Sequence, residues 1–249
     1  MKQFEAVRKA LEDLGGYATL GQIYQKALSY PEVEWGTRTP QASVRRILQQ
    51  RSEFFKIRPG LWGLQARRRE ILRALQIGDE ATPAQVEAFD HTYYQGIIAE
   101  WGNLLRYHTY VPPQDHNRPF LGKRLRDYAT IESIPPFTYP DLTKRASTVD
   151  VIWFAEFMNH LFPVRMFEVE HTTDFHNSLI KFRHFTLFKV EFYVVSPAHR
   201  RREFEEKIVR DHLDLSKSVK FVAYEAWAKV YSKEIERLQA YLEAGLAPL

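Results

Sequence analysis

The front of the chain repeats its apolar positions with the period of a helix. Apolar residues recur every three or four positions at Phe4, Val7, Leu11 and Leu14. This spacing predicts one helix that ends at the glycine pair 15–16, and a second, short helix over residues 20–28. The polar loop SYPEVEWGTR follows the second helix.

A third helix is predicted to begin sharply at residue 40. Thr39 offers a hydroxyl N-cap, and Pro40 occupies the first helical position. Two apolar runs, residues 54–57 and 61–64, then flank a Pro-Gly turn and predict a hairpin. Three helices followed by a hairpin are typical of a winged helix-turn-helix, so we expect this fold over residues 1–66.

The rest of the chain has the pattern of a mixed α/β domain over residues 89–249. A helical connector over residues 67–88 joins it to the front, and a long helix is predicted from 83 to 105. The region from 127 to 147 is proline-rich and indicates a loop. Helices then alternate with four strand-like apolar runs, at 148–154, 164–172, 189–195 and 220–227. The expected fold class is α/β, or α+β overall, with a mixed β-sheet flanked by helices.

Charge separates the same two parts of the chain. The net charge of the 249 residues is +4, but residues 1–69 carry 13 Lys/Arg against 6 Asp/Glu, and residues 70–249 carry 22 against 25. A basic module most often contacts nucleic acid phosphates, although solvated charge on a helical surface is the alternative. The residues expected to touch DNA are Arg45, Arg46, Gln49, Lys56 and Arg58. A winged helix used for protein contacts or dimerisation is the other interpretation.

Several function classes are excluded by what the chain lacks. Without cysteine there are no disulfides, thiolate metal sites or thiol nucleophiles, so any metal must bind to oxygen or histidine. Phosphate-binding loops of the GxxxxGK and GxGxxG types are missing, and no nucleotide cofactor is expected. No apolar run is long enough to cross a bilayer or to act as a signal peptide. We therefore expect a cytoplasmic protein without a membrane partner.

Three acids lie within apolar, strand-like segments. Asp150 interrupts TVDVIWF, and Glu168 with Glu170 interrupts VRMFEVEHT. An unpaired, buried carboxylate costs several kcal/mol, so this pattern points to a site with a cation. If the two strands are neighbours, Asp150 and Glu168 could converge at metal-ligating distance, an arrangement that Mg²⁺ favours. Such a metal activates water and stabilises charge on a phosphodiester.

The segments VDVIWF and FEVEHTTDFHNSLIKF, with the upstream helix IIAEWGNLLRYHTYVP, resemble the PD-(D/E)xK nuclease superfamily and its restriction-endonuclease-like members. The resemblance implies that Asp150, Glu168 and the backbone carbonyl of Val169 bind the metal, and that Glu100 assists through water. It also implies Mg²⁺ as the cofactor, with Mn²⁺ as a substitute, and a homodimer that acts on double-stranded DNA. The segment TPQASVRRILQQRSEFFKIRPGLWGL resembles winged-helix domains fused to bacterial restriction endonucleases and chromatin factors.

One position departs from the superfamily pattern, because Glu170 stands where lysine is usual. Some restriction enzymes carry glutamate there, as a possible general base. Alternatively, the lysine has moved to the next helix, where Lys181 is the candidate, although a solvated helical lysine is the commoner interpretation. His171 is expected on the opposite strand face from the acids, and structural or surface roles are expected for His176 and His184.

These observations together predict a Mg²⁺-dependent DNA endonuclease of restriction or another prokaryotic defence. The winged helix would bind duplex DNA, and the nuclease-like domain would hydrolyse phosphodiesters. Three alternatives remain open: a repair nuclease, a catalytically inactive DNA-binding regulator, and a sensor of modified bases with a nuclease-like fold.

Overall fold

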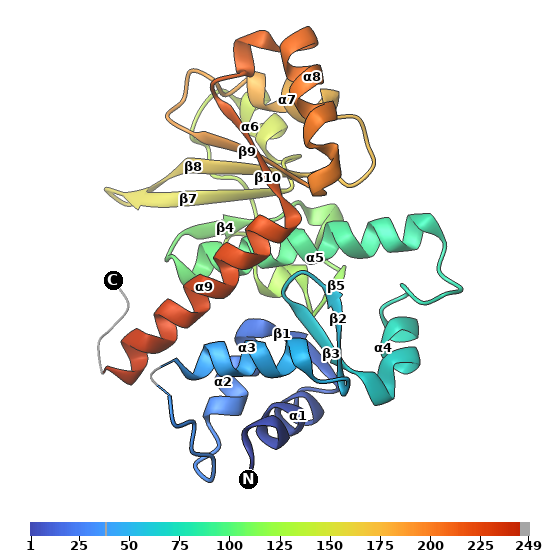
Figure 1. The fold of residues 1–249 in the computed structure, drawn as a ribbon. Helices are drawn as coiled ribbons and strands as arrows, with labels where there is room; N and C mark the ends of the chain where they lie inside the picture. The colour runs from blue at the N-terminus through green and yellow to red at the C-terminus, as the bar shows by residue number, and fades with distance from the viewer. Residues whose placement is uncertain (38, 245–249) are drawn as a thin grey trace. The chain divides into compact units, whose positions relative to one another are not determined.

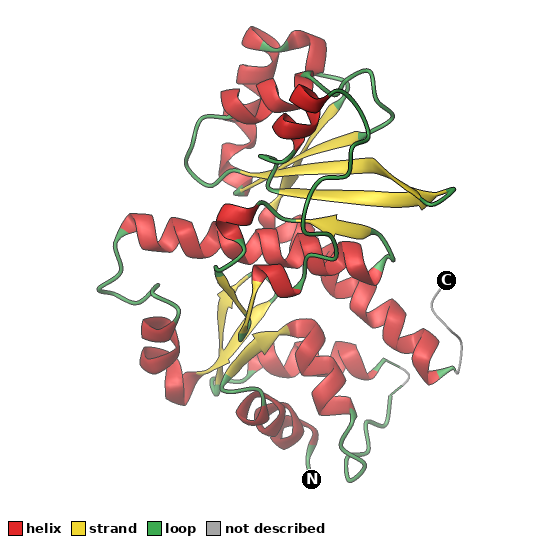
Figure 2. Ribbon diagram, turned by 180° about the vertical axis from the view of Figure 1, so that it is seen from behind, coloured by secondary structure: helices red, strands yellow, loops and turns green. Residues whose placement is uncertain are grey.

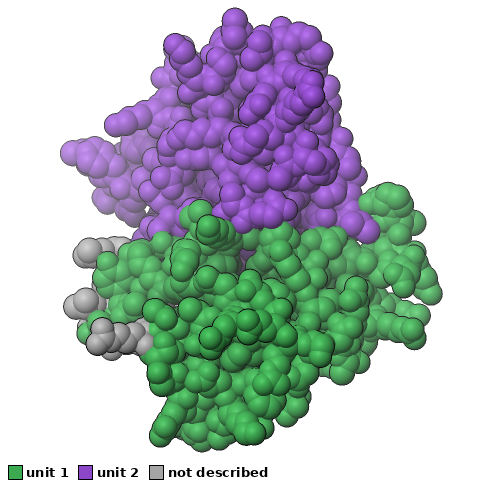
Figure 3. All heavy atoms as spheres, viewed as in Figure 1, with its two compact units in different colours: residues 1–85, 228–249 green, residues 86–227 purple. Residues whose placement is uncertain are grey.

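The computed structural model describes residues 1–37 and 39–244, which form two compact units (Figure 3). The front unit comprises Met1–Gln85 and the segment from Ala228 onwards, and the sheet unit comprises Val86–Trp227. Two helices, α5 (Pro83–Leu104) and α9 (Tyr224–Glu243), begin in one unit and continue into the other. The domain boundaries at residues 66 and 88 stay a prediction, since the structure groups most of α9 with the front unit.

The front unit contains the three helices and the hairpin that the apolar spacing predicts (Figure 1). Its elements are α1 (Gln3–Asp13), β1 (Tyr17–Thr19), α2 (Leu20–Leu28), α3 (Pro40–Gln50), β2 (Phe54–Arg58), β3 (Leu61–Leu64) and α4 (Arg68–Ala74). The strands form an antiparallel sheet in the order β1-β3-β2. The three-residue strand β1 was not predicted, because so short a segment has no readable alternation.

Local chemistry sets the helix ends in the front unit. Gly16 has a φ of 100°, a conformation that side chains with a Cβ rarely adopt, and it follows the end of α1. At the start of α2, the Thr19 side chain accepts a hydrogen bond from the backbone N–H of Gln22 (3.3 Å). At the start of α3, Pro40 holds the first position as predicted, but Thr39 makes no capping hydrogen bond through its side chain. The third helix therefore begins through the fixed φ of proline rather than through a hydroxyl cap.

The sheet unit is built on a five-stranded mixed sheet in the order β10-β9-β8-β7-β4, which confirms the predicted fold class. The strands are β4 (His108–Tyr110), β7 (Val151–Phe157), β8 (His160–Val169), β9 (Glu191–Ser196) and β10 (Val219–Ala223). Pairing is antiparallel for β4·β7 and β7·β8 and parallel for β8·β9 and β9·β10. A separate ribbon joins β5 (Pro119–Phe120) to β6 (Lys123–Arg124). The short 3-10 helices are η1 (Gln65–Arg67), η2 (Pro113–Asp115), η3 (Leu125–Asp127), η4 (Ala198–Arg200) and η5 (Leu213–Leu215).

Helices cover both faces of this sheet (Figures 1 and 2). On one face, α5 packs against β7, where Nε1 of Trp153 donates to the carbonyl of Ile98 (3.1 Å). Gly102 permits this close approach, since a Cβ there would lie 2.6 Å from that indole nitrogen. On the other face lie α6 (Pro140–Ala146), α7 (His176–Arg183) and α8 (Arg201–Asp211). Strand alternation thus sends Trp153 to α5 and its neighbours into the core under α7 and α8.

Two predictions about elements were wrong. The strand predicted over 220–227 ends at Ala223, because Tyr224 and Trp227, three residues apart, form one face of α9 and pack on Tyr94 and Trp101. The predicted loop from 127 to 147 contains the helix α6. None of the helices in residues 1–37 and 39–244 combines the length and the apolar character needed to cross a membrane.

Candidate active site

The ends of β7 and β8 bring two acids together. The antiparallel register pairs Val151 with Phe167, so one step further along places Asp150 opposite Glu168. Both carboxylates are buried, with exposed fractions of 9% and 2%. The predicted adjacency of these two strands is confirmed, and it was the condition on which the convergence of the two acids depended.

Helix α7 supplies a cation to Glu168. Nζ of Lys181 donates to both carboxylate oxygens of Glu168 (2.9 and 2.8 Å) and to the backbone carbonyl of Thr148 (2.8 Å). The Ser178 hydroxyl, one turn earlier on the same helix face, lies 3.2 Å from a carboxylate oxygen of Glu168. The Lys181 side chain is only 25% exposed, so the interpretation of Lys181 as a solvated helical lysine is wrong for this structure.

Glu170 lies beside this pair but just beyond the strand, since β8 ends at Val169. One of its carboxylate oxygens accepts a hydrogen bond from the Ser178 hydroxyl, and the other from the Thr173 hydroxyl. Burial raises the pKa of Glu170. Ser178 thus connects Glu168 and Glu170, which the sequence predicted to share one face of the strand.

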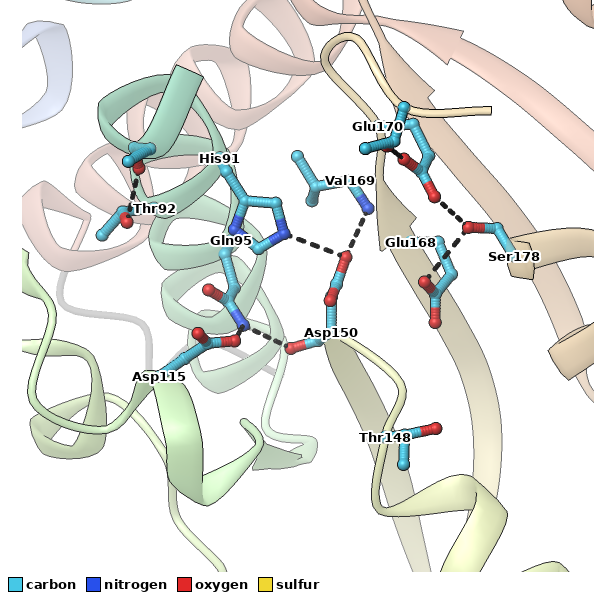
Figure 4. Close-up of polar contacts among 12 residues, drawn as sticks. His91, Thr92, Gln95, Asp115, Thr148, Asp150, Glu168, Val169, Glu170 and Ser178 are labelled. Carbon is cyan, nitrogen blue, oxygen red and sulfur yellow. Dashed lines mark hydrogen bonds and ion pairs between the residues drawn. The ribbon is translucent and has the colours of Figure 1, made fainter. Parts of the chain in front are cut away.

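Helix α5 holds Asp150 from the other side (Figure 4). Nε2 of His91 lies 3.3 Å from Oδ2 of Asp150, and the Gln95 amide donates to the backbone carbonyl of Asp150 (2.9 Å). The backbone N–H of Val169 donates to the same Oδ2 (2.7 Å). Sequence reasoning missed His91 and Gln95, although their spacing of four residues, continued back to Glu87, is the signal of one polar helix face.

The environments of the two acids push their pKa values apart. Burial raises the pKa of Asp150, but His91, Lys181 and the Val169 N–H outweigh burial and lower it below its usual value. Burial, and then the charge of Asp150, raise the pKa of Glu168 well above its usual value, against the opposing effect of Lys181. Such a separation between neighbouring carboxylates is typical of functional sites.

These groups line a cavity of about 560 Å³. The lining includes Glu87, His91, Arg145, Thr148, Asp150, Glu168, Val169, Glu170, His171, Thr173, Asp174, Asn177, Ile180 and Lys181. Five of these side chains are carboxylic acids, and two, Arg145 and Lys181, are permanently charged bases. The cavity therefore has an excess of negative charge that a divalent cation would reduce.

Two sequence interpretations of this neighbourhood change. Glu100, expected as the auxiliary helix glutamate, is not among the residues that line the cavity. Its charge instead adds to the effect of burial, which raises the pKa of Tyr128. The glutamate of α5 that lines the cavity is Glu87, in the first turns of the helix. His171, expected on the opposite face, does line the cavity, and its Nδ1 lies 3.7 Å from Asp90. Strand alternation no longer applies at residue 171, because β8 has ended.

A metal site built from side chains alone is not present in the described part of the chain, where no three His, Asp or Glu residues are arranged to hold an ion. An ion at the cavity would take Asp150, Glu168, a backbone carbonyl such as that of Val169, and waters. These donors are all oxygen atoms, which is the set that Mg²⁺ prefers. The residues present therefore fit magnesium, with Val169 in the third position that the resemblance implies.

The five expected DNA contacts differ in their surroundings. The Arg45 guanidinium is bound within the front unit, to the Tyr24 hydroxyl (3.3 and 3.2 Å) and to the Glu236 carboxylate of α9. Arg46, Gln49 and Lys56 are exposed, the first two on α3 and the third on β2. Arg58, at the end of β2, donates to the carbonyl of Ile57 (2.9 Å).

The sheet unit is thus a mixed α/β domain in which two buried acids at the ends of β7 and β8 lie beside a lysine of α7. Residues 76–246 match the family model of the type II restriction enzyme NmeDI C-terminal domain. The chain belongs to this family and is thereby related to restriction enzymes. No curated protein and no solved structure gives a significant match.

Proposed function

We propose that this protein is a metal-dependent DNA endonuclease of a restriction system. The observation that carries the proposal is the convergence of Asp150, Glu168 and Lys181 at one end of the sheet, in a cavity with excess negative charge. Membership of a family named for a type II restriction enzyme supports the same conclusion. Defence against foreign DNA is the biological setting that we propose.

Each residue of the cavity then has a defined role. Asp150, Glu168 and the Val169 carbonyl would hold Mg²⁺, or Mn²⁺ in its place. When bound, the metal supplies an activated water and stabilises negative charge on the phosphodiester. Lys181 keeps Glu168 in place, and its ammonium group would supply positive charge beside the attacking water or a phosphate oxygen.

Between the two candidates for assisting the water, the contacts favour Lys181 over Glu170. Both oxygens of Glu170 already accept hydrogen bonds, from Ser178 and Thr173. Nζ of Lys181, in contrast, lies directly against Glu168, one of the proposed metal ligands. We assign Glu170 a supporting role in the charge balance of the cavity.

Arg145 adds a contact for the substrate. It is exposed, lines the cavity, and has no ion-pair partner within the described part of the chain. Since a guanidinium group can donate two parallel hydrogen bonds to one phosphate, we propose that Arg145 binds a phosphate next to the scissile bond.

Recognition of DNA is proposed to lie in the front unit, acting as a winged helix over residues 1–66 and joined by the connector 67–88 to the nuclease-like domain 89–249. Arg46, Gln49, Lys56 and Arg58 are the proposed contacts to duplex DNA. Nucleases with one active site per chain generally pair two chains to cleave both DNA strands, so we propose that the protein acts as a homodimer. Sedimentation velocity with and without a DNA duplex measures that association.

Cleavage assays test the proposed activity. Wild-type protein should fragment plasmid or bacterial genomic DNA, methylated or unmethylated, with Mg²⁺ but not with EDTA. The Asp150→Asn variant should not cleave, whereas the matched control Asp141→Asn, on the exposed surface of α6, should cleave normally. DNA binding without cleavage in Mg²⁺, Mn²⁺ or Co²⁺ on every substrate would contradict the enzyme and favour a DNA-binding regulator.

A further inference from the structure

A closed ring of polar contacts passes through Asp150, the first proposed metal ligand, and Figure 4 shows its members His91, Gln95 and Asp115. His91 joins Oδ2 of Asp150 (3.3 Å) to an N–H of Arg118 (3.5 Å). Arg118 pairs with Oδ1 of Asp115 (2.8 Å), and Oδ2 of Asp115 accepts from the Gln95 amide (3.0 Å). The Gln95 amide also donates a hydrogen bond to the backbone carbonyl of Asp150 (2.9 Å), which closes the ring.

The Gln95 and Asp115 side of the ring is buried, whereas the Arg118 side chain is 40% exposed, and the hydrogen-bond direction at Gln95 is fixed. Gln95 and Asp115 are almost fully buried, at 0% and 3% exposed. Both partners of the Gln95 nitrogen are acceptors, the carboxylate of Asp115 and the carbonyl of Asp150, so the amide has one orientation only. A buried network with one allowed direction holds its members in one geometry.

The same reasoning assigns the proton of His91. A guanidinium has donors and no acceptor, so the contact with Arg118 makes Nδ1 of His91 the acceptor. The proton is then on Nε2, which donates to Oδ2 of Asp150. Oδ2 receives a second hydrogen bond from the Val169 N–H, and Oδ1 accepts none from the described residues.

We propose that His91 is a positioning residue for Asp150. It holds Oδ2 toward α5 and keeps Oδ1 available as the metal-binding oxygen, while Arg118 fixes the tautomer in which His91 donates. This inference rests on the proposed function. Residues that orient a metal ligand through a hydrogen bond typically contribute about 10- to 100-fold to metal affinity.

Binding of Mn²⁺ to the whole protein without DNA, measured by calorimetry or electron paramagnetic resonance, tests this role independently of cleavage. His91→Leu should weaken Mn²⁺ binding by about tenfold or more. His91→Gln, which retains an N–H donor near the position of Nε2, should recover most of the affinity. His199→Leu, at an exposed histidine in η4, is the matched control and should bind as wild type does.

The outcomes separate the inference from the proposed function. If the wild-type protein binds no Mn²⁺, this result contradicts both the proposed metal-dependent activity and the proposed role of His91. Wild-type binding with unchanged affinity in a folded His91→Leu variant overturns only the inference. If His91→Leu does not fold, Arg118→Met provides the same test, because Arg118 is away from Asp150 and is partly exposed. Loss of affinity in Arg118→Met supports the role, and unchanged affinity overturns it.

Discussion

The backbone N–H of Val169 donates to Oδ2 of Asp150 over 2.7 Å, across the neighbouring ends of β7 and β8. This bond fixes one carboxylate oxygen and joins the two strands at the point where Asp150 lies opposite Glu168. An asparagine at position 150 can still accept hydrogen bonds there but carries no charge. We therefore expect Asp150→Asn to fold, to bind DNA and to lose about a thousandfold or more in cleavage rate.

Asp150→Ala should be less stable than Asp150→Asn, because Val169 and His91 would both lose an acceptor in a buried site. The expected difference is about 1–3 kcal/mol in the free energy of unfolding, measured by urea titration. Equal stability of the two variants would show that these hydrogen bonds contribute little to the fold.

Lys181 and Glu170 are distinguished by their partners. Lys181→Met removes the cation from Glu168, and we expect the single-turnover cleavage rate to fall by about 100-fold or more at saturating Mg²⁺. Glu170→Gln keeps a side chain that can bond to Ser178 and Thr173, and its rate should fall by less than about tenfold. The reverse ranking would make Glu170 the residue that assists the water.

Stability should depend on pH through Glu168. Burial and the charge of Asp150 raise the pKa of Glu168 above 4.5, so the folded protein holds this proton more tightly than the unfolded chain does. The corresponding contribution to the free energy of unfolding is complete below about pH 4.5 and is lost as the pH rises through the folded pKa. In EDTA, wild type should therefore lose stability relative to Glu168→Gln as the pH rises above about 4.5.

The comparison with Glu168→Gln is necessary because other groups also titrate in this range. Burial lowers the pKa of His184 and of His212, which makes their contributions rise with pH. Urea unfolding at several pH values, with both proteins in the same buffers, isolates Glu168. Added Mg²⁺ should reduce the loss in wild type, since the metal binds the ionised carboxylate. A wild-type stability that rises with pH relative to Glu168→Gln would contradict the assigned pKa direction.

Two adjacent arginines on α3 should behave differently. Arg46 is exposed, so Arg46→Ala should weaken DNA binding and reduce the slope of log affinity against log salt by about one. Arg45 is bound to Tyr24 and Glu236, so Arg45→Ala should leave that slope unchanged and cost about 1 kcal/mol of stability. Unchanged slopes in both variants would place the DNA contacts outside α3.

The sequence predicted most of what depends on local patterns. The period of the apolar residues located α1, α2, α3 and α5, and the acids within apolar runs pointed to Asp150 and Glu168. Strand adjacency was an assumption that the β7·β8 pairing confirms, because two strands joined by a short turn usually pair.

What the sequence could not predict depends on how elements pack. The rotation of α5 about its axis is set by contacts such as Trp153 against Gly102, and this rotation directs Glu87 and His91, rather than Glu100, toward the cavity. The position of Lys181 follows in the same way from the packing of α7 on the sheet. Arg45 meets Glu236 across 191 residues of chain, a separation at which spacing carries no signal.

A crystal structure with Mn²⁺ tests the central claim most directly, because the anomalous signal of the ion locates it without ambiguity. We predict a peak in the cavity of the sheet unit, about 2 Å from oxygens of Asp150, Glu168 and the Val169 carbonyl. The peak should disappear in Asp150→Asn. A peak bound to other residues, or none in the cavity at millimolar Mn²⁺, would contradict the claim that these residues hold the catalytic metal.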